Sequence, residues 1–180
     1  MALREVLKFP DPRLRQVSEP VSEVTPELRE LARDMLEVMY DEPGIGLAAP
    51  QVGVPQRLVV MDTEWSEEGG RRNPRVLVNP QIVHREGRIV WTEGCLSVPD
   101  FQAEVERSER VRVVARDLDW KELEIDASGL EAVCLQHEID HLDGILFIDR
   151  ISRLKRSLYV KKRKKALRLE EQEQARPGSL

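Results

Sequence analysis

The sequence predicts a mixed α and β domain in which strands pack around one buried helix. Three observations indicate this. An apolar stripe of helical spacing follows residue 26, strand periodicity runs from residue 57 to residue 126, and a helix that is apolar on nearly all sides follows residue 128. The 180 residues, 41% hydrophobic and 34% charged, can bury one core without disulfides and leave a heavily charged surface.

The first helix is expected at residues 27–40. Thr25 is a favoured N-cap residue, and Pro26 suits the first helical position. Pro43 and Gly44 end the pattern, because neither residue continues a helix well. The apolar stripe consists of Leu28, Leu31, Met35, Val38 and Met39.

Strands are expected between residues 57 and 126, where apolar residues form short runs or alternate with polar ones. Residues 63–74 are rich in Gly, Glu and Arg, so we expect a surface loop there. Residues 117–120 are expected to form the turn between the last two strands. The four predicted strands are residues 58–61, 76–78, 110–115 and 122–125.

A second helix is expected from Ser128 to about Leu142. Ser128 and Glu131 have the spacing of a capping box, and Gly144 is a typical stop. Because the helix is apolar on nearly all sides, we place it at the centre of the fold. Its thin polar strip holds Gln136, Asp140 and Asp143, and one of its faces holds Leu130, Val133, Cys134, His137 and His141.

A last helix is expected from residue 151 to about residue 171, with a frayed end at residues 172–180. It carries a basic run, Lys-Lys-Arg-Lys-Lys, at residues 161–165. We therefore expect residues 1–150 to form the catalytic body of the domain, and residues 151–180 to be a peripheral part of the same domain.

Composition excludes several classes of protein. The net charge of −5 argues against a protein whose whole surface embraces nucleic acid. Charged residues interrupt every apolar run near the N-terminus, so no secretory signal is expected there, and no run approaches the length of a membrane span. In the reducing cytoplasm, where we expect this protein to work, Cys95 and Cys134 favour a metal or catalytic role over a disulfide.

The sequence His-Glu-Ile-Asp-His at residues 137–141 predicts a metal site. Residues four apart on a helix share one face, so His137 and His141 can bind the same ion. Glu138 lies about 100° further round the helix and can reach the open side of that ion. The alternative is that both histidines are hydrogen-bonded core residues, but burying them beside a glutamate without a metal carries a large desolvation cost.

A catalytic ion of this kind usually has a third protein ligand and one open position. No histidine follows His141 in the chain, so the third ligand is sought upstream. Cys95 can supply a thiolate, and Gly94 before it permits close approach of the backbone. Cys134 lies three residues before His137 and also points towards the site. Spacing alone therefore leaves Cys134 open, as a pocket residue or as a competing ligand.

Three segments together resemble the peptide deformylase family. They are Gly-Ile-Gly-Leu-Ala-Ala-Pro-Gln at residues 44–51, Glu-Gly-Cys-Leu-Ser at residues 93–97, and Gln-His-Glu-Ile-Asp-His-Leu-Asp-Gly at residues 136–144. The resemblance implies an α+β fold in which antiparallel β-sheets surround a central metal-binding helix. It also implies a hydrolase that removes the formyl group from the N-terminal methionine of new bacterial polypeptides.

The resemblance also implies a role for individual residues. Cys95 is the third metal ligand, whereas Cys134 lines the substrate pocket. Glu138 is the catalytic acid and base. Gln51, through its side-chain amide, and Leu96, through its backbone N–H, bind the developing oxyanion.

The same resemblance implies a pocket for the methionine side chain. Trp91 is larger than the aliphatic residue expected at the rim of this pocket. Gly44 and Gly46 expose backbone with which an extended substrate can pair as an added strand. Without the other two motif segments, these glycines would indicate only a turn after the helix. Glu93 and Arg107 match a pair expected to steady the Cys95 loop. The pocket residues are Ile45, Trp91, Leu130, Val133 and Cys134.

One thiolate and two imidazoles suit Fe(II), Zn(II), Co(II) or Ni(II), and the resemblance implies Fe(II) as the physiological ion. An HExxH zinc endopeptidase is the alternative enzyme, and a structural metal module is the alternative outside enzymes. The basic run at residues 161–165 is a candidate for docking on ribosomal RNA; otherwise it is a solvated helix end.

Overall fold

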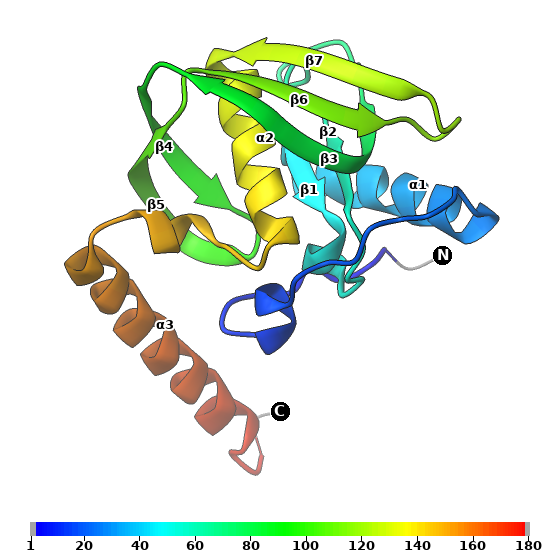
Figure 1. Cartoon of the computed structure of the whole chain (residues 1–180). Coiled ribbons are helices and arrows are strands. Elements are labelled where there is room, and N and C mark those ends of the chain that lie inside the picture. The colour runs from blue at the N-terminus through cyan, green and yellow to red at the C-terminus, as the bar shows by residue number, and fades with distance from the viewer. Residues whose placement is uncertain (1–2, 179–180) are drawn as a thin grey trace.

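The centre of the fold is α2 (Gly129–Leu142), which packs against one face of a five-stranded antiparallel sheet (Figure 1). The computed structural model describes residues 3–178. Every residue of α2 from Ala132 to Leu142 is buried, which confirms the predicted central helix. An α+β fold with antiparallel sheets around this helix, as the resemblance implies, is confirmed as well.

The large sheet has the strand order β1-β2-β3-β6-β7, and all its pairs are antiparallel. Its inner face forms one apolar core with α2. Its first strand, β1, lies at the edge of the sheet, so one side of β1 has no neighbouring strand in it. The strands are β1 (Gly46–Ala48), β2 (Leu58–Met61), β3 (Arg75–Glu86), β6 (Arg110–Arg116) and β7 (Glu122–Ser128).

All four strands predicted from periodicity are present, but β3 is longer than expected. It continues through Pro80 to Glu86, with register shifts against β6 where Asn79 has a positive φ of 51°. The predicted turn at residues 117–120 is confirmed, since Asp117 Oδ1 accepts hydrogen bonds from the backbone of Asp119 and Lys121. Residues 63–74 form an irregular loop, as expected.

A second sheet, which the periodicity did not predict, holds the remaining strands. It consists of β4 (Ile89–Cys95) and β5 (Val98–Arg107), paired antiparallel through a turn at residues 96–97. Most of β4 is exposed, including Val90 and Trp91, so it lacks the alternating apolar face by which strands are recognised. This sheet lies on the other side of α2 and places Cys95 at the end of a strand (Figure 1).

The first helix, α1 (Pro26–Asp41), matches its prediction. Thr25 Oγ1 accepts a hydrogen bond from the backbone N–H of Leu28, at 3.2 Å, which caps the helix. The predicted apolar stripe is buried against the core that lies beside β1 and β2.

The start of α2 differs from its prediction, whereas its end does not. Ser128 is the N-cap residue, but its side chain makes no capping hydrogen bond, so the predicted capping box is wrong. The reason is that Ser128 also ends β7, paired with Arg110, while Glu131 is drawn to Arg75. Gly144 follows the helix with a φ of +73°, and a Cβ there would lie 2.4 Å from the Arg15 carbonyl oxygen. Glycine is therefore required at this stop.

The last helix, α3 (Arg153–Gln174), extends away from the body of the protein (Figure 1). Ser152 caps it, and Tyr159 is its one buried residue. Tyr159 stacks on Phe101 and lies near Phe9, so the first turns of α3 belong to the core. The helix continues to Gln174, further than predicted, and residues 179–180 of the expected frayed end lie outside the described residues.

Three short 3-10 helices complete the fold: η1 (Pro12–Arg15), η2 (Ala49–Val52) and η3 (Phe147–Arg150). Within residues 3–178, none of the helices combines the length and the apolar character that crossing a bilayer would require.

Candidate metal centre and its cavity

Three side chains from two elements converge on one point. Cys95 ends β4, and His137 and His141 lie one turn apart on α2. The Sγ atom of Cys95 lies 3.4 Å from His141 Nε2, which lies 3.3 Å from His137 Nε2. These three atoms form the group among residues 3–178 that could hold a metal ion.

The spacing of these atoms fits a bound ion. A tetrahedral ion with metal–nitrogen bonds of about 2.05 Å and a metal–sulfur bond of about 2.3 Å holds its ligand atoms roughly 3.3–3.6 Å apart. The observed separations of 3.3 and 3.4 Å agree with that range. Thiolate and imidazole are also the donor types that a transition metal prefers over calcium or magnesium.

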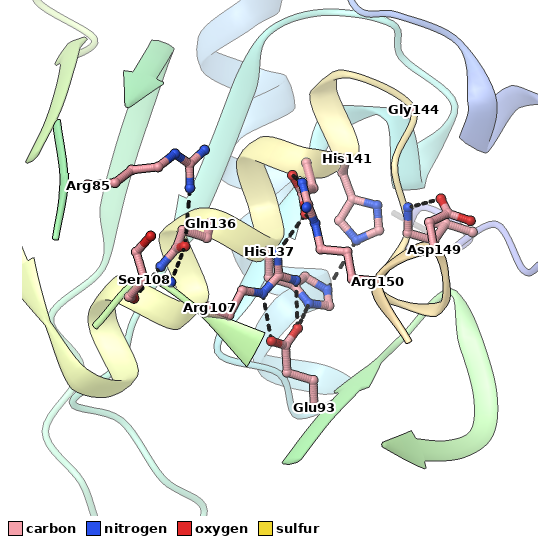
Figure 2. Close-up of polar contacts among 12 residues, drawn as sticks. Arg85, Glu93, Arg107, Ser108, Gln136, His137, His141, Gly144, Asp149 and Arg150 are labelled. Carbon is pink, nitrogen blue, oxygen red and sulfur yellow. Dashed lines mark hydrogen bonds and ion pairs between the residues drawn. The ribbon is translucent and has the colours of Figure 1, made fainter. Parts of the chain in front are cut away.

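Glu93 fixes the orientation of the first histidine. The Nδ1–H of His137 donates to Glu93 Oε1 at 2.8 Å (Figure 2). This contact leaves Nε2 facing the other two ligands. Arg107 donates from Nε and Nη2 to the two oxygens of Glu93, each at 2.8 Å. Burial opposes the charge on Glu93, but the hydrogen bonds from Arg107 and His137 outweigh it and lower its pKa to about 2. The pair predicted to steady the Cys95 loop therefore also holds a ligand on α2.

The surroundings of the two rings favour a cation between them. Burial lowers the pKa of His141, so that ring is neutral and can offer a lone pair. Burial also opposes a charge on His137, but hydrogen bonds to Cys95 and Glu93 and the nearby Glu138 raise its pKa. A site that attracts a proton to His137 attracts a divalent ion for the same electrostatic reason.

Glu138 lies beside the three candidate metal ligands but is not one of them. Its Oε1 lies 4.0 Å from His137 Nε2, and its Oε2 is buried with no hydrogen-bond partner. Burial raises the pKa of Glu138 to about 7, near the value at which a carboxyl group exchanges protons best at neutral pH. Gly46 makes room for it, because a Cβ on Gly46 would lie 2.8 Å from Glu138 Oε1.

The side-chain amide of Gln51 is held in one orientation. Its Oε1 accepts a hydrogen bond from the Ala48 backbone N–H at 2.9 Å. Its Nε2 therefore points the other way, donating to Ser97 Oγ at 3.1 Å and lying 3.7 Å from Cys95 Sγ. Gln51 thus presents an N–H group beside the metal ligands, as an oxyanion donor must.

A cavity of about 1000 Å³ opens onto these groups. Cys134 lines it, and its Sγ lies 3.7 Å from the Ile45 carbonyl oxygen instead of joining the three ligand atoms. Burial raises the pKa of Cys134, which disfavours the thiolate that a metal ligand must be. Trp91 also lines the cavity and is 37% exposed. The other expected residues on its wall are Gly44, Ile45, Gly46, Gln51, Cys95, Leu96, Leu130, Val133, His137 and Glu138.

Some residues of the site were given no role from the sequence. Ser97 lies within one of the three motif segments, yet only the structure shows that it orients Gln51. Lys8 donates from Nζ to the Leu96 carbonyl oxygen at 2.7 Å, which fixes the backbone beside Cys95. Nothing in the sequence links Lys8 to a residue 88 positions away.

Comparison with known sequences connects this geometry to one family. The family described as polypeptide deformylase matches residues 3–157. A peptide deformylase from Rhodopseudomonas palustris (strain BisB5) is 54% identical over 167 residues, which are 92% of this chain and 95% of the relative. One from Alkalilimnicola ehrlichii is 55% identical over 168 residues, 93% of each chain.

Solved structures show the same likeness in three dimensions. The crystal structure of a peptide deformylase from Legionella pneumophila superposes with a TM-score of 0.86 and 45% identity, covering 98% of this chain and 100% of that one. A peptide deformylase from Ehrlichia chaffeensis, solved in complex with actinonin, gives a TM-score of 0.85 at 40% identity, covering 92% of this chain and 98% of that one.

Proposed function

The chain belongs to the polypeptide deformylase family, and we propose that it removes N-terminal formyl groups at a centre formed by Cys95, His137 and His141. The observation that carries this proposal is the convergence of three ligand atoms beside a buried glutamate in one open cavity. A divalent ion held there would act as a Lewis acid and lower the pKa of water to about 7.

Glu138 moves the proton in this scheme. Its Oε1 accepts a proton from the water that attacks the formyl carbon, and a carboxyl group with a pKa of about 7 does this readily at neutral pH. The same oxygen then delivers the proton to the peptide nitrogen as the carbon–nitrogen bond breaks. Formate and a peptide with a free amino terminus are the products.

Two donors meet the charge that grows on the formyl oxygen. Gln51 offers its Nε2, whose direction is fixed because Ala48 holds the opposite side of the amide. Leu96 offers its backbone N–H from the turn beside Cys95. The position of this turn is fixed by Lys8, which donates to the carbonyl oxygen of Leu96. One donor of this kind is worth about 3 kcal/mol in the transition state.

The substrate is proposed to bind as an extended chain. β1 is an edge strand, so the backbone at residues 44–46 can pair with a peptide as an added strand. The methionine side chain then enters the part of the cavity that Cys134 and Ile45 share. The remaining walls of that pocket are assigned to Trp91, Leu130 and Val133.

We propose Fe(II) as the physiological ion, with Zn(II), Ni(II) and Co(II) able to replace it. The mixed sulfur and nitrogen donor set supports a transition metal of this group and does not select among its members. Metal analysis of protein purified without oxygen would identify the ion. Iron at one atom per chain supports the assignment, and zinc at that level under the same conditions would contradict it.

A formate-release assay tests the proposed function directly. A formylated methionyl peptide should yield formate and the free amine, while an unformylated peptide of the same sequence should remain intact. Removing the metal with a chelator should stop formate release, and adding Fe(II) back should restore it. Cleavage of an internal peptide bond would instead support an HExxH endopeptidase, which the family membership does not favour.

The proposed substrate is a nascent formylated polypeptide, so we place the activity in the cytoplasm. We also propose that α3 docks on the ribosome through its basic run at residues 161–165. Arg163 faces the body, where its Nε donates to the Phe9 carbonyl oxygen, whereas four lysines of the basic run are exposed. Replacing the exposed lysines 161, 162, 164 and 165 with glutamine should therefore weaken ribosome co-sedimentation at low salt.

We further propose that residues 1–150 contain all catalytic groups. The same lysine replacements should then leave formate release from short peptides unchanged.

A further inference from the structure

Asp140, in the polar strip of α2, is buried and bridges two arginines. Asp140 Oδ2 accepts from Arg107 Nη1 at 2.7 Å and from Arg150 Nε at 2.6 Å. Asp140 Oδ1 accepts from Arg150 Nη2 at 2.7 Å, so Arg150 makes a two-pronged contact. Asp140 is only 7% exposed, which means that these bonds form with little competition from water.

These contacts continue to a metal ligand. Arg107 binds Asp140 with one nitrogen. Its two other nitrogens bind Glu93, which in turn binds His137 Nδ1 (Figure 2). An unbroken series of charge-assisted hydrogen bonds therefore runs from Arg150, at the end of η3, to His137 inside the site.

The charges along this series balance. Glu93 and Asp140 contribute two negative charges, and Arg107 and Arg150 contribute two positive charges. Without Arg150, the single guanidinium of Arg107 would have to serve two buried carboxylates. Because a buried charge without a partner is costly, Arg107 would then be drawn towards Asp140 and its hold on Glu93 would weaken.

We propose that Arg150 is a positioning residue for the metal centre. By neutralising Asp140, it leaves Arg107 free to hold Glu93, and Glu93 to fix the ring of His137. The proposal rests on the proposed metal site but not on the reaction performed there. Mutating the direct partner of a ligating histidine, which here is Glu93, commonly reduces metal affinity by about 10- to 100-fold, and Arg150 acts through that partner at the low end of this range.

Arg150 can be changed without dismantling the fold around it. Its side chain is 40% exposed, so no cavity is left by its removal. η3 keeps its own anchors, since Phe147 and Ile148 are fully buried and the carboxylate of Asp149 accepts the Leu146 backbone N–H. A changed metal affinity would therefore report on the charge series and not on local unfolding.

The test measures the affinity of the protein for Co(II) by competition with a chelator, together with the visible spectrum of the Co(II)-loaded protein. Arg150→Gln should weaken Co(II) binding about tenfold and shift the spectrum, because the His137 ring loses its fixed orientation. Arg150→Lys should recover part of the loss, since it restores the charge but not the two-pronged contact. Arg85→Gln is the matched control, because Arg85 also reaches α2, at Gln136, but lies outside the series.

A double variant separates charge balance from simple damage. Asp140→Asn combined with Arg150→Gln removes one charge of each sign and leaves Arg107 with Glu93 as its sole charged partner. It should bind Co(II) more tightly than Arg150→Gln alone. The proposal is overturned if Arg150→Gln matches the parent protein in affinity and spectrum, or if the double variant is weaker still. Failure of the formate assay with these Co(II) results intact would reject the reaction and leave the positioning role standing.

Discussion

The two long helices of the second half of the chain differ in almost every physical respect. In α2 all residues from Ala132 to Leu142 are buried, including two histidines, a glutamate and an aspartate. In α3, which is longer, Tyr159 alone is buried. The chemistry is concentrated in α2, where each buried polar atom needs a partner, whereas α3 is held by its cap, by Tyr159 and by the contact of Arg163 with Phe9. Changes in α2 should therefore alter chemistry, and changes in α3 should alter stability or docking.

The largest effect is expected from Glu138→Gln. An amide cannot accept and return the proton, so formate release should fall on the order of 10³-fold. Metal content should stay at one ion per chain, because the three ligand atoms are untouched. The free energy of unfolding should not fall, since burial disfavours the charge that is removed. Formate release at the parent rate would remove Glu138 from the mechanism.

The next largest effect is expected from Tyr159→Ala, which changes α3 instead of α2. The change empties space between Phe101 and Phe9 and should lower the free energy of unfolding by about 3 kcal/mol. Well below the melting temperature, formate release per folded molecule should remain unchanged, because no cavity residue is altered. Chemical unfolding measures the expected loss of stability, and a formate-release assay at 25 °C measures the expected unchanged activity. A loss of activity without a loss of stability would link α3 to the site.

A smaller effect on activity is expected from Gly46→Ala. The added Cβ would meet Glu138 Oε1 at 2.8 Å and Cys134 Sγ at 3.0 Å. Glu138 Cγ would also lie 2.9 Å from the new Cβ, and both Glu138 and Cys134 are buried, so their displacement should cost some folding stability as well as the catalytic geometry. A displacement of about 1 Å from the productive geometry can reduce kcat/KM about 100-fold. Steady-state kinetics should show this loss of activity, and thermal unfolding should show a fall in stability of about 1–3 kcal/mol from overpacking.

The smallest effect is expected from Ser97→Ala. It removes one of the two contacts that orient Gln51 and leaves the Ala48 contact in place. Because loss of a whole oxyanion donor costs about 10²- to 10³-fold, loss of its support should reduce kcat about tenfold. KM should change little, since Ser97 itself does not line the cavity. A rise in KM with kcat unchanged would assign Ser97 to substrate binding instead.

The parts of the fold that follow local rules were predictable from the sequence. His137 and His141 share a face because the helix repeats every 3.6 residues, and Thr25 marks the start of α1 through a contact three residues away. β4 was missed because a strand exposed on most of its length shows no apolar alternation.

Contacts between distant segments were not predictable from local patterns, and only the family resemblance grouped Cys95 with His137 and His141. Nothing local to Glu93 shows that it meets a histidine 44 positions later, and nothing local to Arg150 shows that it reaches into a buried network. The motif segments identified the candidate metal ligands. Only the structure shows which residues of β4 and η3 hold the ligand side chains of α2 in position. Local periodicity therefore locates the functional helix, and tertiary structure determines how its side chains are oriented.

X-ray absorption spectroscopy of the fully metal-loaded protein would identify the ligands of the proposed centre. We expect one sulfur from Cys95, two nitrogen ligands from His137 and His141, and one further light-atom ligand from solvent, with the sulfur signal lost in Cys95→Ala. A spectrum without sulfur, or one with four ligands all supplied by protein side chains, would contradict this proposed centre.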